Sequence, residues 1–198
     1  MNLPNVITLS RIPLMFVIVG LMYCDFAGAA TLAFVLFLAA ALGDWLDGYL
    51  ARTRQQVSSF GKLMDAMADK IMVLGIVIAL VERHEVWMVL ALITLCREFL
   101  VTAMRMVAAS KGVVVAADSG GKSKTLTQLI AIGFFLGAAV VAQDLTRLVR
   151  WDVFNFVHSV VQIGLWIFVF STVLSVWSGC RYISRNARVV FGDEKAGA

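Results

Sequence analysis

The segment that decides the fold is residues 44–69, which reads DWLDGYLARTRQQVSSFGKLMDAMAD. It contains four aspartates, and long apolar runs lie on both sides of it. An Asp at the middle of a membrane helix costs about 2.5–3.5 kcal/mol on the insertion scale, and less near the interface. Four of them beside apolar runs therefore require a compensating interaction, so this segment is both a helix boundary and a candidate functional site.

The composition of the chain is that of a membrane protein. Hydrophobic residues make up 61% of the 198 residues and charged residues only 15%, whereas soluble domains are about half apolar and about a quarter charged. These fractions exclude a disordered chain, a collagen-like fibre and an ordinary soluble domain. Three cysteines are too few for a disulfide framework. The length predicts a single domain over residues 1–198.

Six apolar stretches predict membrane helices, each of which needs about 20 residues to cross the hydrocarbon core. They cover residues 7–23, 31–45, 71–81, 86–109, 126–142 and 154–177. The second and third look short because charged residues interrupt them, and the helical periodicity continues through both. We predict an all-α, polytopic membrane protein with six transmembrane helices and a polar cavity open to the cytoplasm. Gly133 and Gly137 are spaced for close packing of membrane helices.

The distribution of basic residues predicts the orientation. With a cytoplasmic amino terminus, thirteen of the 17 Lys and Arg fall on the inner side, Arg97 lies within the fourth stretch, and only Arg83, Arg147 and Arg150 fall outside. Cytoplasmic loops carry such an excess, so both termini and the four aspartates are expected to face the cytoplasm at the cell membrane. The same excess explains the net charge of +4, and we predict no nucleic-acid partner.

The four aspartates are spaced to meet across one helix pair. Asp44 and Asp47 are three residues apart, and Asp65 and Asp69 are four apart, so each pair lies on one face of its helix. A short polar turn joins the two helices, which makes them antiparallel neighbours. Two carboxylates about 4 Å apart repel by about 4 kcal/mol at an effective dielectric constant near 20. Protons or divalent cations must relieve that repulsion.

Two functions fit the carboxylates taken alone. Oxygen ligands without Cys or His favour Mg²⁺ or Mn²⁺ over zinc, and two such ions about 3.5–4 Å apart can hold the attacking and leaving oxygens of a phosphoryl displacement. Carboxylates inside a membrane protein equally suit a proton or divalent-cation pathway. Their spacing leaves both possibilities open.

The residues around the aspartates favour phosphoryl chemistry. Small residues stand one helical turn from an aspartate at Gly48, Ala51 and Gly61, and they leave room for a flat or bulky group at the backbone. Arg52 follows directly, and a guanidinium fork suits a phosphate diester. A single Gly in a membrane helix indicates only close packing, but a cation pathway has no use for this combination.

The full string is D-x-x-D-G-x-x-A-R-x8-G-x-x-x-D-x-x-x-D, with every fixed position filled. It resembles the signature of the CDP-alcohol phosphatidyltransferases, membrane enzymes that move a phosphatidyl or similar group from a CDP-linked donor to an alcohol. The resemblance implies two bound Mg²⁺ or Mn²⁺ ions on Asp44, Asp47, Asp65 and Asp69. It also implies that Asp69 is the general base, and that the CDP donor lies on Asn5, Thr8, Asp47, Gly48, Ala51, Arg52 and Gly61.

Three further segments resemble the branch of this family whose acceptor is glycerol 3-phosphate. These are P-N-x-x-T-x-x-R at residues 4–11, R-E-x6-R at residues 97–105 and G-K-x-K-T-x-x-Q at residues 121–128. Lysines and a hydroxyl at a helix start suit a phosphate. The resemblance implies that the acceptor phosphate binds to Arg97, Arg105, Lys122, Lys124 and Thr125. An internal ion pair between Arg97 and Glu98 is the alternative for the second segment.

The expected reaction joins CDP-diacylglycerol and sn-glycerol 3-phosphate by direct displacement, with release of CMP. The resemblance also implies a homodimer. Two alternatives remain open at this point. In the first alternative, the chain belongs to the family but its acceptor is another alcohol, such as phosphatidylglycerol, serine or an inositol phosphate. In the second, the chain lies outside the family and transports divalent cations.

Overall fold

The computed structural model describes residues 3–50, 59–110, 119–146 and 153–191. Within these ranges, only the backbone is described for residues 3–9, 44–50, 59–69, 109–110, 119–122 and 187–191. The described chain is all-α, as predicted. Its helices are α1 (Leu3–Tyr23), α2 (Ala29–Leu50), α3 (Ser59–Glu82), α4 (Met88–Ser110), α5 (Ser119–Ala139) with its π-helical continuation η2 (Val140–Leu145), and α7 (Phe154–Phe191).

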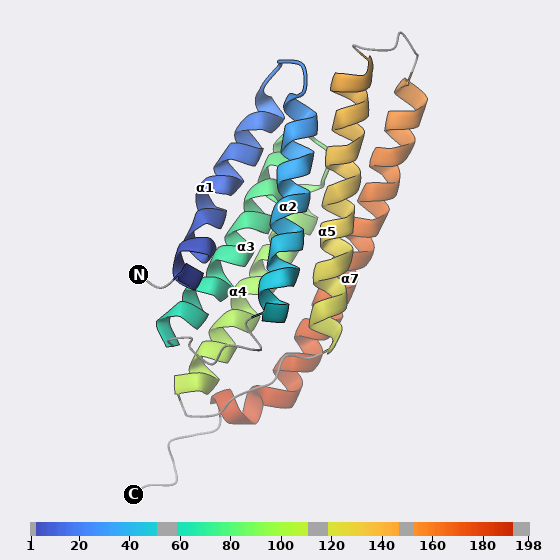
Figure 1. Ribbon diagram of the computed structural model, residues 1–198. Helices are drawn as coiled ribbons and strands as arrows, with labels where there is room; N and C mark the ends of the chain where they lie inside the picture. The colour runs from blue at the N-terminus through green and yellow to red at the C-terminus, as the bar shows by residue number, and fades with distance from the viewer. Residues whose placement is uncertain (1–2, 51–58, 111–118, 147–152, 192–198) are drawn as a thin grey trace, which may run out of the picture.

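These segments form six rods in one bundle (Figure 1). Each of the six predicted apolar stretches corresponds to one rod, and the second and third do continue through the aspartates. By length and composition, Ser123–Leu145 and Phe154–Asn186 can each span a membrane, while Ser10–Tyr23 and Ala29–Gly43 are shorter apolar segments. These spans are those of the residues that the structure describes.

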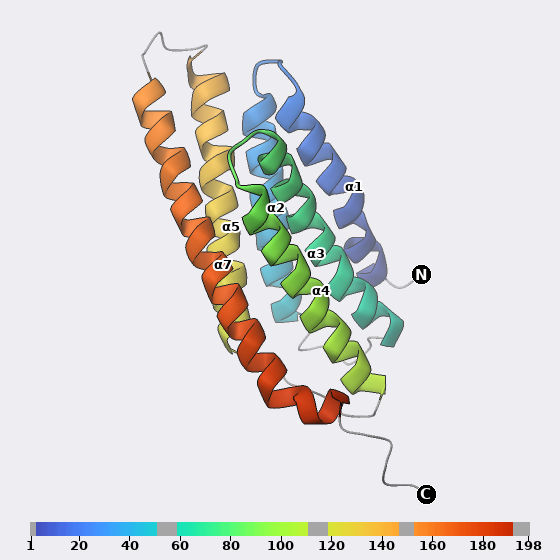
Figure 2. The same ribbon diagram turned by 180° about the vertical axis from the view of Figure 1, so that it is seen from behind.

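The last helix is much longer than its apolar stretch. The prediction ended it at Trp177, but α7 continues to Phe191 and contains 38 residues. At about 1.5 Å per residue it is about 57 Å long, well beyond the roughly 30 Å hydrocarbon core. The end of the apolar pattern marks where the helix leaves the apolar layer, which need not be where the helix ends. No proline follows Trp177 to stop the helix there. Figure 2 shows the end of α7 turning beneath the end of α4.

The core lies between five of the six rods. Its fully buried side chains include Ile18 of α1, Phe37 of α2, Ile76 of α3, Phe135 of α5 and Phe168 of α7. Over the described stretches the backbone of α1 approaches both α2 and α3, whereas the backbones of α2 and α3 do not approach each other closely. The expectation that α2 and α3 are direct neighbours is therefore wrong for this part of the bundle.

Close helix packing occurs at glycines other than the predicted pair. A Cβ at Gly133 or Gly137 would meet no described atom within 4 Å. At Gly75 a Cβ would clash with the sulfur of Met15, and at Gly164 it would lie 3.1 Å from Cβ of Phe134. Close contact between α1 and α3 therefore occurs at Gly75, where a Cβ would displace the flexible Met15 side chain, and close contact between α5 and α7 occurs at Gly164.

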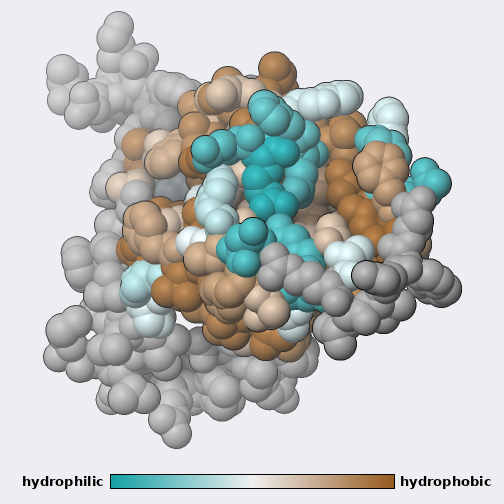
Figure 3. Space-filling model, turned by 90° about the horizontal axis from the view of Figure 1, so that it is seen from above, coloured by the Kyte–Doolittle hydropathy of each residue, from teal (hydrophilic) through white to brown (hydrophobic). Residues whose placement is uncertain are grey.

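Polar side chains brace the end of the bundle opposite to the aspartate positions. The carboxylate of Asp144 accepts hydrogen bonds from the backbone N–H of Gly28 (2.8 Å) and Thr31 (2.8 Å) and from Oγ1 of Thr31 (2.6 Å). It thereby caps the start of α2 from a distant part of the chain. Gly28 has a φ of +92°, which favours glycine at this turn. Figure 3 looks onto this end and shows hydrophilic residues in a strip between apolar ones.

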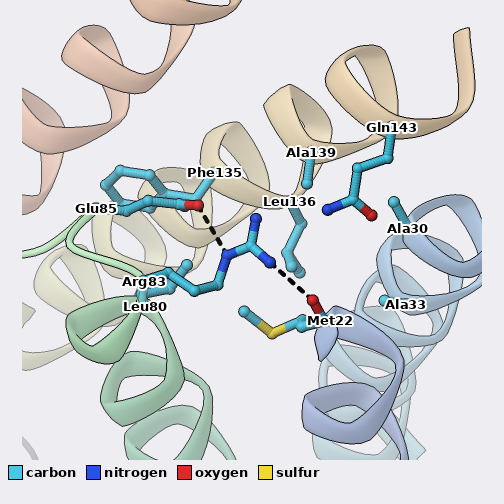
Figure 4. Close-up of a pocket in the computed structure, with 10 residues that line it drawn as sticks. All are labelled: Met22, Ala30, Ala33, Leu80, Arg83, Glu85, Phe135, Leu136, Ala139 and Gln143. Carbon is cyan, nitrogen blue, oxygen red and sulfur yellow. Dashed lines mark hydrogen bonds and ion pairs between the residues drawn. The ribbon is translucent and has the colours of Figure 1, made fainter. Parts of the chain in front are cut away.

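A small cavity lies beneath this polar end (Figure 4). Its volume is about 10 Å³, enough for about one water molecule. Arg83 donates from Nε to Glu85 (2.9 Å) and from Nη1 to the carbonyl of Met22 (2.7 Å) at its rim. Burial raises the pKa of Glu85, and the neighbouring Arg83 acts in the opposite direction. These contacts join the helix ends and are too confined to admit a nucleotide.

Candidate active site

The backbone brings the predicted donor and metal residues to one end of the bundle. Asp44, Asp47 and Gly48 lie in the last turns of α2, and Gly61, Asp65 and Asp69 lie in the first half of α3, which runs in the opposite direction. Asn5 and Thr8 lie in the first turns of α1 at the same end. The side chains of all these residues, and Ala51 and Arg52 entirely, lie outside the described part.

The donor set of the four aspartates fits a hard divalent cation. It offers only carboxylate oxygens, which Mg²⁺ and Mn²⁺ prefer. Among the residues whose side chains the structure describes, no group of three or more His, Cys, Asp or Glu could hold a metal ion. The metal prediction on Asp44, Asp47, Asp65 and Asp69 therefore stays a prediction.

A buried ionic cluster at this end joins three helices. The Glu98 cluster consists of Glu98 and Arg97 on α4, Lys70 on α3 and Lys124 on α5. Oε1 of Glu98 accepts a hydrogen bond from Nη1 of Arg97 (2.9 Å) and also contacts Nζ of Lys124, while Oε2 lies 3.8 Å from Nζ of Lys70. The side chains of Glu98 and Lys124 are only 11% and 5% exposed. One carboxylate thus holds cations from three helices.

The Glu98 cluster connects the aspartate helix to the predicted acceptor residues. Lys70 follows Asp69 directly in the sequence, and its Nζ donates to Oγ1 of Thr102 on α4. That hydroxyl in turn donates to the backbone carbonyl of Glu98 (2.7 Å). The position of Asp69 along α3 is therefore tied to the helix that carries Arg97 and Glu98.

Arg97 is bound to α7 as well as to Glu98. Its Nε donates to the backbone carbonyl of Ser175 (3.0 Å), and its Nη2 donates to Oγ of Ser178 (2.8 Å). A Cβ at Gly179 would lie 3.0 Å from Cγ of Arg97, so a glycine there lets the arginine lie against the helix. The structure thus contains the Arg97–Glu98 ion pair that the sequence left as an alternative. That Arg97 also binds an anion stays a prediction.

Sequence reasoning missed a row of buried hydroxyls on α7. This α7 polar row consists of Ser171, Thr172, Ser175 and Ser178. Oγ of Ser171 donates to the backbone carbonyl of Lys124 (3.0 Å), and Oγ1 of Thr172 lies 3.5 Å from Oγ1 of Thr94. The signal is present in the sequence, because residues 171, 175 and 178 recur at helical spacing inside an apolar run.

The remaining predicted acceptor residues lie on α4 and α5. Lys124 and Gln128 are buried one turn apart on α5, and Thr125 is half-buried between them. The guanidinium of Arg105 is exposed and lies over the ring of Tyr182, 5.5 Å from its centroid. Lys122 lies on α5, and its side chain is outside the described part. Positive charge from α3, α4 and α5 therefore gathers at the end of the bundle that carries the aspartates.

Comparison with known proteins gives a consistent result over nearly the whole chain. The sequence profile described as CDP-alcohol phosphatidyltransferase matches residues 1–177. A CDP-diacylglycerol–glycerol-3-phosphate 3-phosphatidyltransferase of Bacillus subtilis (strain 168) is 38% identical, over 93% of this chain and 95% of its own length. Proteins of the same name from Rickettsia bellii (strain RML369-C) and Salmonella typhimurium (strain LT2) are 34% and 31% identical, over 89% and 92% of this chain and 92% and 93% of their own lengths.

Proposed function

This chain belongs to the CDP-alcohol phosphatidyltransferase family, and we propose that it transfers the phosphatidyl group of CDP-diacylglycerol to sn-glycerol 3-phosphate, with release of CMP. It is a transferase of phospholipid synthesis and a membrane protein with helical spans. The observation that carries the proposal is the coincidence, at one end of the bundle, of the complete aspartate motif and of the basic residues around Glu98. The first provides a site for a diphosphate, and the second provides a site for an anionic acceptor.

The donor half of the site is formed by α2, α3 and the start of α1. Gly48, Ala51 and Gly61 make room for the cytidine nucleotide, together with Asn5 and Thr8. Arg52 binds the diphosphate through its guanidinium fork. The acyl chains stay in the lipid while the nucleotide lies in a polar cavity open to the cytoplasm.

The metal-binding residues are Asp44, Asp47, Asp65 and Asp69. When two divalent cations are bound there, they supply positive charge against the diphosphate and the departing CMP. Such a set binds Mg²⁺ or Mn²⁺ through oxygen alone.

The reaction is a direct displacement that uses the chain's own general base. The primary hydroxyl oxygen of glycerol 3-phosphate forms a bond to the phosphorus that carries the diacylglycerol, and the bond from that phosphorus to the oxygen of CMP breaks. Asp69 takes the hydroxyl proton. The products are phosphatidylglycerophosphate and CMP, and no covalent intermediate is needed.

The acceptor phosphate binds to Arg105, Lys122, Lys124 and Thr125, with Arg97 beside them. A phosphorylated acceptor fits this set better than serine does, because serine brings no phosphate to pair with three or more basic side chains. Both termini face the cytoplasm in this proposal, which follows from the excess of basic residues at that side. A homodimer is the expected assembly, and residues 1–198 form one domain.

The proposal is tested with purified protein in detergent micelles, measuring CMP release and incorporation of labelled acceptor into lipid. We expect both only when CDP-diacylglycerol, glycerol 3-phosphate and Mg²⁺ are all present. Faster turnover with phosphatidylglycerol, serine or inositol phosphate would contradict the choice of acceptor. Divalent-cation flux into proteoliposomes without CMP release would contradict the proposal that the protein is a phosphatidyltransferase.

The base is tested by Asp69→Asn, which should abolish turnover while the protein still inserts and folds. Asp25→Asn is the matched control, because Asp25 is exposed in the turn between α1 and α2 at the opposite end. We expect the control to keep wild-type turnover. Substantial turnover in Asp69→Asn would refute the assignment of the base.

A further inference from the structure

Tyr182 lies on the part of α7 that extends beyond the apolar stretch. Its side chain is only 4% exposed and packs with Val101 and Met104 of α4 and with Ile183. The turn of α7 beneath α4 in Figure 2 brings this segment under the end of the bundle that carries the aspartate positions. Tyr182 is therefore buried against α4, the helix that carries Arg97 and Arg105.

The ring of Tyr182 supports the guanidinium of Arg105. The guanidinium carbon lies 5.5 Å from the ring centroid, within the range of a cation–π contact. Arg105 makes no hydrogen bond or ion pair with any described residue. The stacked face of the planar guanidinium is thus occupied, while the N–H groups along its edge stay available to an anion such as a phosphate.

The hydroxyl of Tyr182 is buried and has no hydrogen-bond partner among the described residues. A buried polar group without a partner loses its hydration, which makes such groups rare in folded proteins. Phenylalanine would fill the same space without that cost. The hydroxyl belongs to the same ring that lies against Arg105, and no described residue takes up its hydrogen-bonding capacity.

We propose that Tyr182 is an acceptor-binding residue: its ring orients Arg105, and its hydroxyl donates a hydrogen bond to the phosphate monoester of the acceptor. This inference rests on the proposed function and adds to the site a residue from the extension of α7. It also explains why α7 continues as a helix after leaving the apolar layer, because the extension completes the acceptor site from below α4.

The test compares Tyr182→Phe and Tyr182→Leu with the wild type. Tyr182→Phe removes only the hydroxyl, and loss of one hydrogen bond to a charged group should raise the KM for glycerol 3-phosphate about tenfold. Tyr182→Leu also removes the ring and should raise it about threefold more. The KM for CDP-diacylglycerol should stay unchanged in both variants, since the donor site lies on α1, α2 and α3.

Trp177→Leu is the matched control, because Arg181 lies over the ring of Trp177 at 5.4 Å on the same helix. Trp177 is exposed on the bundle surface, so its loss should leave both KM values unchanged. An unchanged acceptor KM in Tyr182→Phe, or an equal rise in both KM values, would overturn the inference.

A second readout does not depend on turnover. Glycerol 3-phosphate should raise the Tm of the wild type, and the same concentration should raise the Tm of Tyr182→Phe by less. Equal shifts would overturn the role of Tyr182 even if the wild type proved inactive. A wild type that binds glycerol 3-phosphate but makes no lipid from it would instead contradict the proposed reaction and leave the binding result standing.

Discussion

Replacing Glu98 by Gln is the most informative perturbation of the described site. The amide keeps the size of the side chain and can still accept the hydrogen bond of Arg97, but the negative charge is lost. Arg97, Lys124 and Lys70 then face one another around a neutral group. Because the four side chains are only 5–24% exposed, water screens this repulsion weakly.

The expected loss of stability can be estimated from the contacts. Removing one partner of a buried ion pair costs about 3–5 kcal/mol, and the most exposed cation, Lys70, is also the most distant at 3.8 Å. We therefore take the lower limit, about 3 kcal/mol. For a chain of this length each kcal/mol changes Tm by about 2–4 °C, so Glu98→Gln should lower Tm by roughly 6–12 °C.

The assay is thermal unfolding of purified variants in the same detergent. Glu85→Gln is the matched control, since Glu85 has one cationic partner, Arg83, at the opposite end of the bundle. The cost of burying the Glu85 charge offsets the gain from its ion pair with Arg83. The free energy of unfolding of the control should therefore differ from that of the wild type by less than about 1 kcal/mol. Adding Lys124→Leu to Glu98→Gln should recover part of the loss, because it removes one of the repelling charges. A Tm for Glu98→Gln within 2 °C of the control, or a double variant less stable than the single one, would refute the reasoning.

Three further predictions concern other parts of the chain. Lys124→Ala should raise the KM for glycerol 3-phosphate more than that for CDP-diacylglycerol in steady-state assays, and a change in the donor KM alone would mean that the acceptor site lies elsewhere. Asp144→Asn should lower the free energy of unfolding by about 2 kcal/mol, since hydrogen bonds to a charged group are weakened; unchanged thermal unfolding would contradict the cap on α2. Burial raises the pKa of Glu85 above 4.5, so the native state binds its proton more tightly, and the Tm of the wild type relative to Glu85→Gln should fall as pH rises above 4.5. If the Tm of the wild type relative to Glu85→Gln rose with pH instead, the inferred direction of the pKa change would be wrong.

The apolar pattern predicted the helices well, because an apolar segment inside lipid must hydrogen-bond all of its own backbone N–H and C=O groups, and a helix does so. It could not predict where α7 ends, since Trp177 marks the limit of the apolar run and the helix continues in polar sequence to Phe191. The spacing of glycines within one helix also could not show which of them pack against a neighbouring helix. Gly133 and Gly137 had the right spacing but face no described atom, while Gly75, with no comparable signal, lies against Met15.

The candidate site was predictable where residues act through local spacing. The four aspartates follow from a fixed string, and the Arg97–Glu98 pair follows from adjacency in the sequence. The partners of Glu98 on α3 and α5, and the support of Arg105 by Tyr182, depend on which helices pack together. Such contacts between distant segments are set by the fold, and a single sequence does not contain them in readable form.

The central claim is that the four aspartates bind two divalent ions next to each other. It is tested most directly by electron paramagnetic resonance of Mn²⁺ bound to the purified protein in the presence of CDP-diacylglycerol. Two ions about 3.5–4 Å apart interact magnetically, so we predict two Mn²⁺ per chain with a spin-coupled spectrum that is lost in Asp65→Asn. Mn²⁺ that binds as isolated single ions, or binding that Asp65→Asn leaves unchanged, would contradict the account.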